Sequence, residues 1–446
     1  MADAALKCPP LPPPLAGRAK AFLVGLSGGL DSMVLLHLLA TAPPRPGLPL
    51  RAIHVHHGLH PEADAWAAHC EAACAAWSVP LQVVRVRVPR ASGPGPEAAA
   101  RVARHAAFAG HLREDEVLAL AHHQDDQAET FLLRALRASG PDGLAAMRPW
   151  RAYPPGWLWR PLLDRPREAL LVHARGHGLD WVEDPSNAEV DFDRNFLRAQ
   201  VMPLLRERWP HAAAALARSA ALSAEAAALL REGDARALHS VRGDSADVLD
   251  AGALQALPRE RRARVLRLWI ERLGLPPLPA NGVAQVEAAL LQATADSEAE
   301  FAWSGARLRR WRQWLHAGAA VPALPADWDI AWDGSAPLAL PAGGLLRLEG
   351  AERFETPLRV HARQGGERIR LPGRDHHHAL KRVLQERGVP PWERQRLPLL
   401  SDPEGTLLAA GDQVLSGALE AWLAARGASV VWDRGDAVAA CAAPTS

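Results

Sequence analysis

The sequence predicts an α/β fold: a doubly wound parallel sheet, followed by a small helical domain and a C-terminal α+β domain. Three observations predict it. Apolar runs alternate with helical patterns from about residue 21 to 121, the order that produces parallel strands joined by crossover helices. Residues 212 to 298 are alanine-rich and helical in pattern. The last part, from about 355 to 440, combines strand patterns with one helical pattern.

The first part contains four strand patterns, AFLVGL, LRAIHV, LQVVRVRV and VLALAH. The helical patterns between them are SMVLLHLLA, EADAWAAHCEAACAAW and PEAAARVARHAAFAGHL. Ligands of doubly wound sheets bind outside the carboxyl ends of the strands. We therefore expect SGGLD, HHGLH and HHQDD, which each follow a strand pattern, to meet at one edge of the sheet.

The rest of the chain indicates the domain boundaries. The segment that begins RPLLDRPREALL reads as a short strand, a helix and a loop, and RNFLRAQVMPLLRERW reads as a long helix. A proline-rich stretch near 319–329 indicates a linker or an irregular excursion. We expect a first domain at 1–211, a helical domain at 212–325, a linker with short strands at 326–354 and a C-terminal domain at 355–446.

Charge and cysteine content exclude several classes of protein. The 446 residues include 51 basic and 50 acidic side chains, so any nucleic-acid surface must be a local patch. Four cysteines without a CxxC pair argue against a disulfide framework or a thiolate metal site. The sequence has no run of 18 or more apolar residues and no secretory signal pattern. We expect a cytoplasmic protein without a membrane segment.

The stretch FLVGLSGGLDS, residues 22–32, is typical of a phosphate site. A strand that ends in two glycines before a helix brings unobstructed N–H groups to the helix N-terminus, where phosphate binds. A Gly-Gly turn alone is common, but here two hydroxyls and a carboxylate accompany it, and a carboxylate suits magnesium. The stretch matches neither the Walker loop nor GxGxxG. The predicted nucleotide contacts are Ser27, Gly28, Gly29, Leu30, Asp31 and Ser32, with Asp31 as the Mg²⁺ ligand.

The stretch AHHQDDQAET, residues 121–130, follows another strand of the same sheet. On a helix, Asp126 and Glu129 lie on one face because they are three residues apart. Capping explains acidic residues in a first helical turn, but here two histidines and Asp125 accompany them. The stretch therefore suggests a site for a cation or an amine beside the nucleotide.

These stretches together resemble the PP-loop superfamily of N-type ATP pyrophosphatases, and within it the tRNA(Ile)-lysidine synthetase family. The resemblance rests on SGGLDS, IHVHHGLHPEADAWAAHCEAAC and HHQDDQAET. Further matches are PEAAARVARH, RPLL, WVEDPSN, DFDRNFLR and GGERIRLPGRDHHHALKRVLQERGVPPWERQRLPLL, in the same order along the chain. Two departures are His105, where the family often has tyrosine, and His60, where arginine is frequent.

The resemblance implies an ATP- and Mg²⁺-dependent ligase whose partners are free L-lysine and the minor tRNA(Ile) with anticodon CAU. The family adenylates the wobble cytidine and then joins lysine to its carbon 2, and charging switches from methionine to isoleucine. The implied parts are a PP-loop catalytic domain, a substrate-binding domain and a tRNA-binding C-terminal domain, and no obligate protein partner is evident. Asp126 and Glu129 are the candidates for holding lysine, with Asp125 as a backup.

Several arginines are candidates for phosphate or RNA contacts. Residues 363–396 carry nine basic and four acidic side chains, and within them Arg368, Arg370 and Arg374 are the expected tRNA contacts. In the first domain, Arg101, Arg104, Arg194 and Arg198 are further candidates, for which surface ion pairs are an equal alternative. The segments 259–273 and 307–315 add positive charge beside tryptophans, and we expect Trp269 in a core.

Two other functions and two possible metal sites remain as alternatives. A thiolating PP-loop enzyme would need a catalytic cysteine or a cluster-binding CxxC, for which Cys70 and Cys74 are a poor substitute. An RNA-binding protein could use ATP only as a conformational ligand. We expect the histidines His54, His56 and His57 to pack and hydrogen-bond, and His376, His377 and His378 to cap a helix start, in preference to binding metal.

Overall fold

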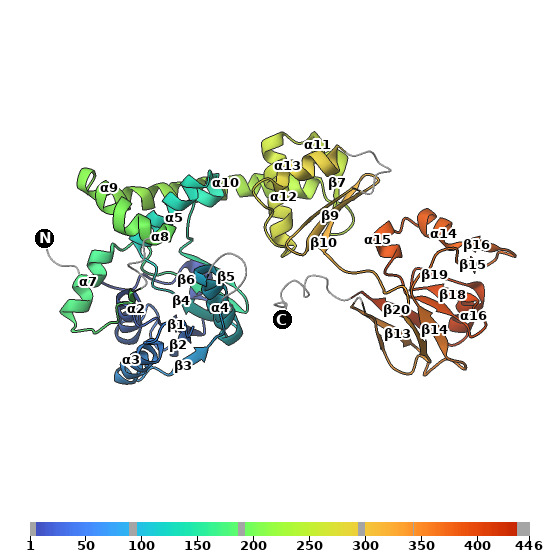
Figure 1. The fold of residues 1–446 in the computed structure, drawn as a ribbon, viewed down its shortest axis with the longest axis horizontal. Helices are drawn as coiled ribbons and strands as arrows, with labels where there is room; N and C mark the ends of the chain where they lie inside the picture. The colour runs from blue at the N-terminus through green and yellow to red at the C-terminus, as the bar shows by residue number, and fades with distance from the viewer. Residues whose placement is uncertain (1–5, 89–95, 186–191, 293–298, 342, 435–446) are drawn as a thin grey trace. The chain divides into compact units, whose positions relative to one another are not determined.

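The computed structural model describes residues 6–88, 96–185, 192–292, 299–341 and 343–434. The end of WVEDPSN and the first residue of DFDRNFLR lie outside these ranges. The chain forms two compact units, Met1–Arg231 and Glu232–Ser446 (Figure 1). The first unit contains the mainly parallel sheet, and the second contains helices and mainly antiparallel sheets. The predicted fold class is therefore confirmed.

A six-stranded sheet forms the centre of the first unit, with the order β3-β2-β1-β4-β6-β5. The strands are β1 (Ala21–Gly25), β2 (Leu50–His56), β3 (Leu81–Arg85), β4 (Glu116–Ala119), β5 (Trp150–Tyr153) and β6 (Gly156–Trp159). All neighbours pair in parallel except β5, which is antiparallel to β6. The strand order reverses between β1 and β4, and such a switch point is where doubly wound sheets bind ligands.

Helices cover both faces of this sheet (Figure 1). They are α1 (Pro13–Ala16), α2 (Leu30–Thr41), α3 (Ala63–Ala76), α4 (Pro96–His111), α5 (Gln124–Leu136), α6 (Pro141–Leu144) and α7 (Arg167–Gly176). The four predicted strands and the three crossover helices are confirmed. The strand expected at RPLL is wrong, because β6 ends at Trp159 and the chain turns there.

The predicted long helix after residue 193 is confirmed, with an interruption. It consists of α8 (Asp193–Phe196), a π-helical segment (Leu197–Val201) and α9 (Met202–Arg208). The interruption ends two residues before Pro203, which has no N–H to donate to an α-helical bond. Single π-helical turns are frequent at functional sites.

The second unit begins within the long helix α10 (Ala212–Ser240). The expected helices follow as α11 (Ala251–Ala256), α12 (Arg259–Arg272), α13 (Gly282–Val286) and a π-helical turn (Glu287–Leu291). They pack with an antiparallel sheet of β7 (Val248–Asp250), β10 (Trp314–Ala319), β9 (Ala306–Trp311) and β8 (Glu300–Trp303). The region is therefore mixed α and β, whereas its sequence pattern predicts mainly helix.

The C-terminal part packs around two further sheets. One contains β11 (Asp329–Trp332), β14 (Leu358–His361), β15 (Arg368–Arg370), β16 (His377–Ala379), β17 (Leu399–Ser401), β18 (Leu407–Ala410) and β19 (Val414–Leu415). The other contains β12 (Leu338–Ala339), β13 (Leu345–Glu349) and β20 (Ser429–Asp433). Its helices are α14 (Leu380–Glu386), α15 (Pro391–Arg394) and α16 (Gly417–Ala424).

The segment 326–354, expected to be a linker with short strands, belongs to these sheets. Its strand β11 pairs with β14, and its strand β13 pairs with β20 at the far end of the chain. Local sequence does not reveal such pairing, because the partners lie up to about ninety residues away. The segment is thus part of the C-terminal core and not a linker.

Among the residues that the structure describes, one helix is long and apolar enough to cross a membrane by length and composition alone. It is α10, of 29 residues, although the sequence pattern gave no expectation of a span. A single helix of this kind is weak support for a membrane segment, because helices of other proteins pass the same test.

Candidate active site

The PP-loop lies between β1 and α2, at the switch point of the sheet. Gly28 has a φ of +87°, which favours glycine, and a Cβ there would lie 3.2 Å from Cys70 Sγ. The hydroxyls of Ser27 and Ser32 are hydrogen-bonded at 3.0 Å, and the Ser32 hydroxyl donates to the carbonyl of Gly29 at 2.9 Å. These bonds close the loop at the N-terminus of α2, where its backbone N–H groups can receive phosphate oxygens.

Asp31 lies in the first turn of α2 and has an unsatisfied oxygen. Its Oδ1 is buried and makes no hydrogen bond in the described structure. A buried acceptor without a partner is costly in a protein unless a ligand satisfies it. A hard cation with oxygen ligands fits this atom, so the residues present suit the predicted Mg²⁺.

His123 lies between the PP-loop and the acidic pair. Its Nε2 is 3.5 Å from Asp31 Oδ2 and 3.4 Å from Asp126 Oδ2. The backbone N–H of His123 also donates to Asp126 Oδ2 at 3.1 Å, and this closes a capping box at the start of α5. The structure therefore brings Asp31 and Asp126, which are 95 positions apart, to one buried imidazole.

Asp126 stays ionised despite its burial. Burial alone would raise its pKa, but electrostatic interactions with His123 and Arg194 hold the pKa below its usual value. An Arg198 Nη2 donates to Asp126 Oδ1 at 3.1 Å. Asp126 is therefore a carboxylate at neutral pH, suited to attracting a cation.

Glu129 is fully buried and already paired with two arginines. Arg194 Nε donates to Glu129 Oε2 at 2.9 Å, and Arg198 Nε donates to Glu129 Oε1 at 2.8 Å. The two arginines are four residues apart on the α8 and π-helical segment, so both reach the same carboxylate. The sequence left two roles open for these arginines, a contact with phosphate or RNA and an ion pair. In this structure both arginines form ion pairs.

The other first-domain candidates have varied surroundings. Asp125 accepts the backbone N–H of Arg167 at 2.9 Å and pairs with Arg206, so it joins α5 to α7 and α9. Arg101 and Arg104 lie on α4. The two residues that depart from the family pattern make local contacts. His105 Nδ1 is hydrogen-bonded to the Tyr153 hydroxyl at 3.0 Å, and the ring of His60 stacks on that of Trp66.

Arg160 is a site residue that the sequence reasoning missed. It is buried directly after β6, at the same sheet edge, and its Nε donates to His122 Nδ1 at 3.2 Å. Burial, together with smaller contributions from the charges of Arg151 and Arg101, lowers the pKa of Arg160 to about 10. The feature of the sequence that could have identified Arg160 is its position at the carboxyl end of a strand, as the first residue of the matched motif RPLL.

The histidines at the end of β2 have structural partners. His54 donates from Nδ1 to the carbonyl of Leu26 at 2.9 Å, and His56 Nε2 lies 3.2 Å from Asp64. Burial, followed by the charge of Arg104, lowers the pKa of His57 to about 4. The expected packing and hydrogen bonding agrees with these contacts for His54 and His56.

In the C-terminal part, the three predicted tRNA contacts lie on one hairpin. Arg368 and Arg370 are exposed on β15, with the buried Ile369 between them, and Arg374 is exposed in the following turn. Arg368 donates to the carbonyl of His377 at 2.7 Å, and Arg370 donates to that of Arg374 at 3.2 Å. These bonds fix the side chains at the surface.

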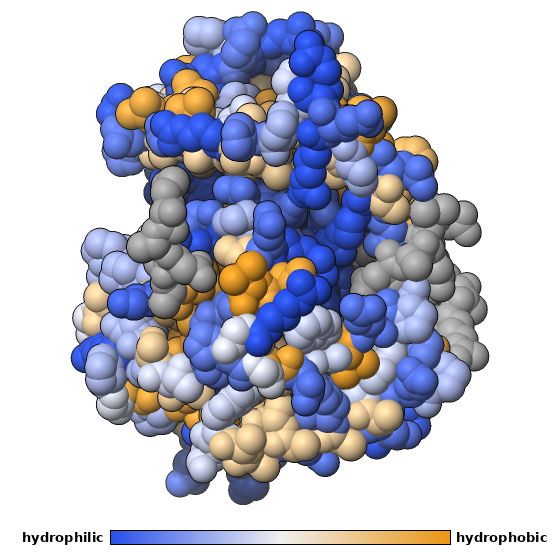
Figure 2. All heavy atoms as spheres, turned by 90° about the vertical axis from the view of Figure 1, so that its left-hand side faces the viewer, coloured by the Kyte–Doolittle hydropathy of each residue, from blue (hydrophilic) through white to orange (hydrophobic). Residues whose placement is uncertain are grey.

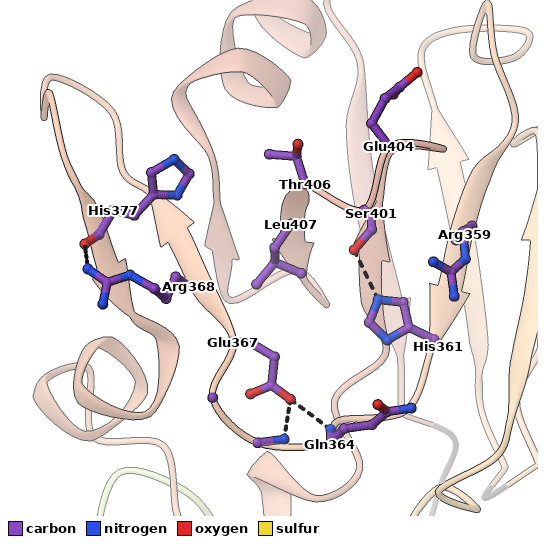
Figure 3. A pocket seen from close by; sticks show the side chains of 13 residues that line it. Arg359, His361, Gln364, Glu367, Arg368, His377, Ser401, Glu404, Thr406 and Leu407 are labelled. Atoms are coloured by element: carbon purple, nitrogen blue, oxygen red, sulfur yellow. Dashed lines mark hydrogen bonds between the residues drawn. The ribbon is translucent and has the colours of Figure 1, made fainter.

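A cleft of about 530 Å³ adjoins this hairpin. Figure 3 shows Arg368 and His377 on one side and Arg359, His361 and Ser401 on the other. His361 Nε2 and the Ser401 hydroxyl are 2.9 Å apart. The cleft is polar and carries arginines at both walls.

Several of the other basic candidates are buried or form ion pairs. Arg394 is buried, and Arg382 pairs with Glu386 at 2.9 Å. Asp234 pairs with Arg261 and Arg264 on α12, while Trp269 is buried and donates to a backbone carbonyl. Lys381 on α14 and Arg387 at its end remain exposed beside the three arginines of the hairpin.

The histidines His376, His377 and His378, expected to cap a helix, do not do so. They lie before α14, and His377 and His378 belong to β16, which pairs with β15.

The comparisons with known proteins agree with this arrangement. Residues 11–205 match the PP-loop domain family, 249–316 match the TilS substrate binding domain and 358–432 match the TilS substrate C-terminal domain. A tRNA(Ile)-lysidine synthase from Xanthomonas axonopodis pv. citri is 58% identical over 92% of this chain and 93% of its own length. The chain belongs to the tRNA(Ile)-lysidine synthase family.

Other members of the tRNA(Ile)-lysidine synthase family are also similar. That of Xylella fastidiosa is 53% identical over 92% of this chain and 94% of its own length, and that of Yersinia pseudotuberculosis is 41% identical over 89% and 90%. Membership makes the chain a ligase of the PP-loop superfamily, and the PP-loop match supports the use of ATP. The resemblance inferred from the motifs is therefore confirmed.

Proposed function

We propose that the chain joins free L-lysine to carbon 2 of the wobble cytidine of the minor tRNA(Ile), whose anticodon is CAU. In the first step, the O2 oxygen of cytidine attacks the α-phosphorus of ATP, and pyrophosphate leaves. In the second step, the ε-amine attacks carbon 2, the C2–O bond breaks and AMP leaves with that oxygen. The amine proton is released, and the product, lysidine, pairs with adenosine. Charging then switches from methionine to isoleucine.

The observation that carries the proposal is the buried, unpartnered oxygen of Asp31 at the phosphate-binding end of α2. The loop of Ser27, Gly28, Gly29, Leu30 and Ser32 would bind the ATP phosphates, and Asp31 would hold Mg²⁺. When bound, Mg²⁺ neutralises phosphate charge. Most catalysis in such transfers comes from positioning and charge neutralisation, which a closed loop provides.

The acidic pair would receive lysine beside the nucleotide. A free lysine amine has a pKa of about 10.4, so it arrives protonated and is attracted to a carboxylate, which would orient it and accept a proton before the amine attacks carbon 2. Asp126 is ionised and lies beside His123, next to the loop. Both carboxylate oxygens of Glu129 already accept hydrogen bonds from Arg194 and Arg198. To bind the lysine amine, Glu129 would therefore exchange one of these arginines for lysine. An arginine released in this way would be available to substrate phosphate.

The thiolating alternative is disfavoured by the surroundings of the described cysteines. Burial raises the pKa of Cys70 to about 12, with small contributions from Cys74 and Glu71. Burial also raises the pKa of Cys74 to about 11 and that of Cys8 to about 12. Buried thiols with raised pKa values are poor nucleophiles.

The deciding experiment uses nucleoside mass analysis. The protein is incubated with unmodified minor tRNA(Ile), ATP, Mg²⁺ and lysine, and the tRNA is then digested. We expect a cytidine whose mass has increased by lysine less water, and only when all components are present. ATP hydrolysis or binding without this product would favour an RNA-binding protein that uses ATP as a ligand.

The C-terminal hairpin would grip the tRNA backbone. Replacing Arg368, Arg370 and Arg374 by glutamine removes up to three phosphate contacts. Each contact contributes about 0.7 to 0.9 to the log–log salt slope, so the slope should flatten by roughly two to three units. The measurement is tRNA binding over a range of salt concentrations, with ATP affinity unchanged.

A matched control replaces the exposed Arg236, Arg242 and Arg353 of the same unit by glutamine. This triple variant loses the same number of positive charges at sites outside the hairpin. Its tRNA binding should keep most of the wild-type salt slope. Wild-type affinity and slope in the hairpin variant would remove the hairpin from the tRNA surface.

A further inference from the structure

Three histidines from two helices gather at one place in the first unit. His37 lies on α2, His173 lies on α7, and His177 is the residue that ends α7. The two helices pack against each other (Figure 1). One ring nitrogen of each histidine lies within 4.8 Å of the others. No function considered so far uses this cluster.

The ring contacts within the cluster are close. His37 Nδ1 lies 3.0 Å from His173 Nε2, and the rings of His173 and His177 stack with centroids 4.1 Å apart. His173 and His177 are four residues apart, which places both on one face of α7. His37 faces them from α2, so two rigid elements present three imidazoles to one point.

The hydrogen bonding of His177 selects a tautomer suited to metal binding. Its Nδ1 lies 2.9 Å from the carbonyl oxygen of His173, and the N–H of that nitrogen donates to it. The Nε2 lone pair of His177 is then available to a metal. A backbone carbonyl that fixes the second nitrogen is the usual outer partner of a metal-binding histidine.

The surroundings favour neutral imidazoles with access to solvent. His173 is buried, His37 is partly buried and His177 is exposed, which leaves an entry path. Burial, followed by the charges of His177 and His37, lowers the pKa of His173 to about 4. Burial also lowers the pKa of His37. Neutral imidazole is the form that binds a metal ion.

We propose that His37, His173 and His177 form a three-imidazole site for a divalent transition-metal ion, zinc, with its fourth position open to water. Zinc binds imidazole nitrogens at about 2.0–2.1 Å in a tetrahedron, which places the ligand atoms about 3.3 Å apart. The widest pair, at up to 4.8 Å, therefore has to close by about 1.5 Å. Rotation of the exposed His177 side chain supplies this movement.

A metal here would tie together two helices that support the active site. Helix α2 begins at the PP-loop and carries Asp31, and the first N–H of α7 donates to Asp125 at 2.9 Å. The histidines lie toward the opposite ends of both helices. Zinc should therefore stabilise the first unit against thermal unfolding, whatever reaction the protein catalyses.

The test uses the full chain, stripped of metal with a chelator and dialysed. Zinc sulfate is titrated by calorimetry in the presence of excess Mg²⁺, and thermal unfolding is measured with and without zinc. We expect a tight phase of one zinc per chain with a Kd of about 1 μM or lower, and a rise in Tm. Cobalt in place of zinc should give the visible absorption of a tetrahedral site.

The variants His177→Gln and His37→Gln should weaken zinc binding by more than about tenfold and remove the rise in Tm, since even loss of an outer partner costs that much. His177 is exposed, so its replacement carries little risk to folding. The control His211→Gln removes another exposed histidine of the same unit and should bind zinc as the wild type does. Equal zinc affinity in wild type and His177→Gln would overturn the proposal.

Discussion

Asp31→Asn should abolish formation of adenylated tRNA while the protein stays folded. The substitution keeps the size of the side chain and removes the charge that would hold Mg²⁺ beside the loop. The fold should tolerate it, because Oδ1 has no hydrogen bond to lose. Loss of one preorganised electrostatic contact costs about a hundredfold to a thousandfold in rate. We therefore expect adenylation to fall by at least about a hundredfold.

The measurement is pyrophosphate release with tRNA and ATP, together with the thermal unfolding temperature. Asp164→Asn is the control, because this exposed aspartate lies in the same unit and its side chain is 71% exposed. It should retain wild-type rates. Normal adenylation by Asp31→Asn would contradict the assignment of Asp31 and the function proposed for the loop.

Glu129→Gln should separate the two chemical steps. The variant keeps the shape of the side chain and loses the negative charge that we propose lysine meets. A charge-assisted hydrogen bond contributes about 1.5–3 kcal/mol, so the lysine concentration for half-maximal rate should rise about ten- to a hundredfold. Adenylated tRNA, measured in a single turnover without lysine, should form at nearly the wild-type rate.

The buried ion pairs make this a sharp test. If Glu129 serves mainly to hold Arg194 and Arg198 in place, its replacement disturbs the arginines and both steps fall together. That result would place Glu129 in the nucleotide half of the site. Glu207→Gln, an exposed carboxylate on the neighbouring helix α9, is the matched control and should change neither step.

The local features of the first unit could be predicted from sequence because they depend on short-range patterns. A buried parallel strand reads as an apolar run, and AFLVGL and VLALAH were recognisable for that reason. The conformation of the loop SGGLDS is also predictable from local sequence, because two glycines and the start of a helix follow the strand directly. The strand order then brings both motifs to the switch point.

Contacts between distant segments could not be predicted in the same way. Nothing near Glu129 in the sequence indicates that Arg194 and Arg198, more than sixty residues later, neutralise it. The strand β13 reads as an isolated apolar run until β20 supplies its hydrogen bonds. The three histidines on α2 and α7 were likewise separate residues until the packing of two helices joined them.

The position of His123 between two carboxylates has a thermodynamic consequence. Its ring is within 3.5 Å of Asp31 and within 3.4 Å of Asp126, so a cation bound by either aspartate changes the charge that the shared imidazole senses. If Mg²⁺ binds at Asp31 and lysine binds at Asp126, as we propose, nucleotide and amino acid would not bind as independent events. Reciprocity requires that the factor by which one ligand alters the affinity of the other is the same in both directions. Occupancy of the two halves of the pocket would thus be cooperative, and a single ring would carry the coupling.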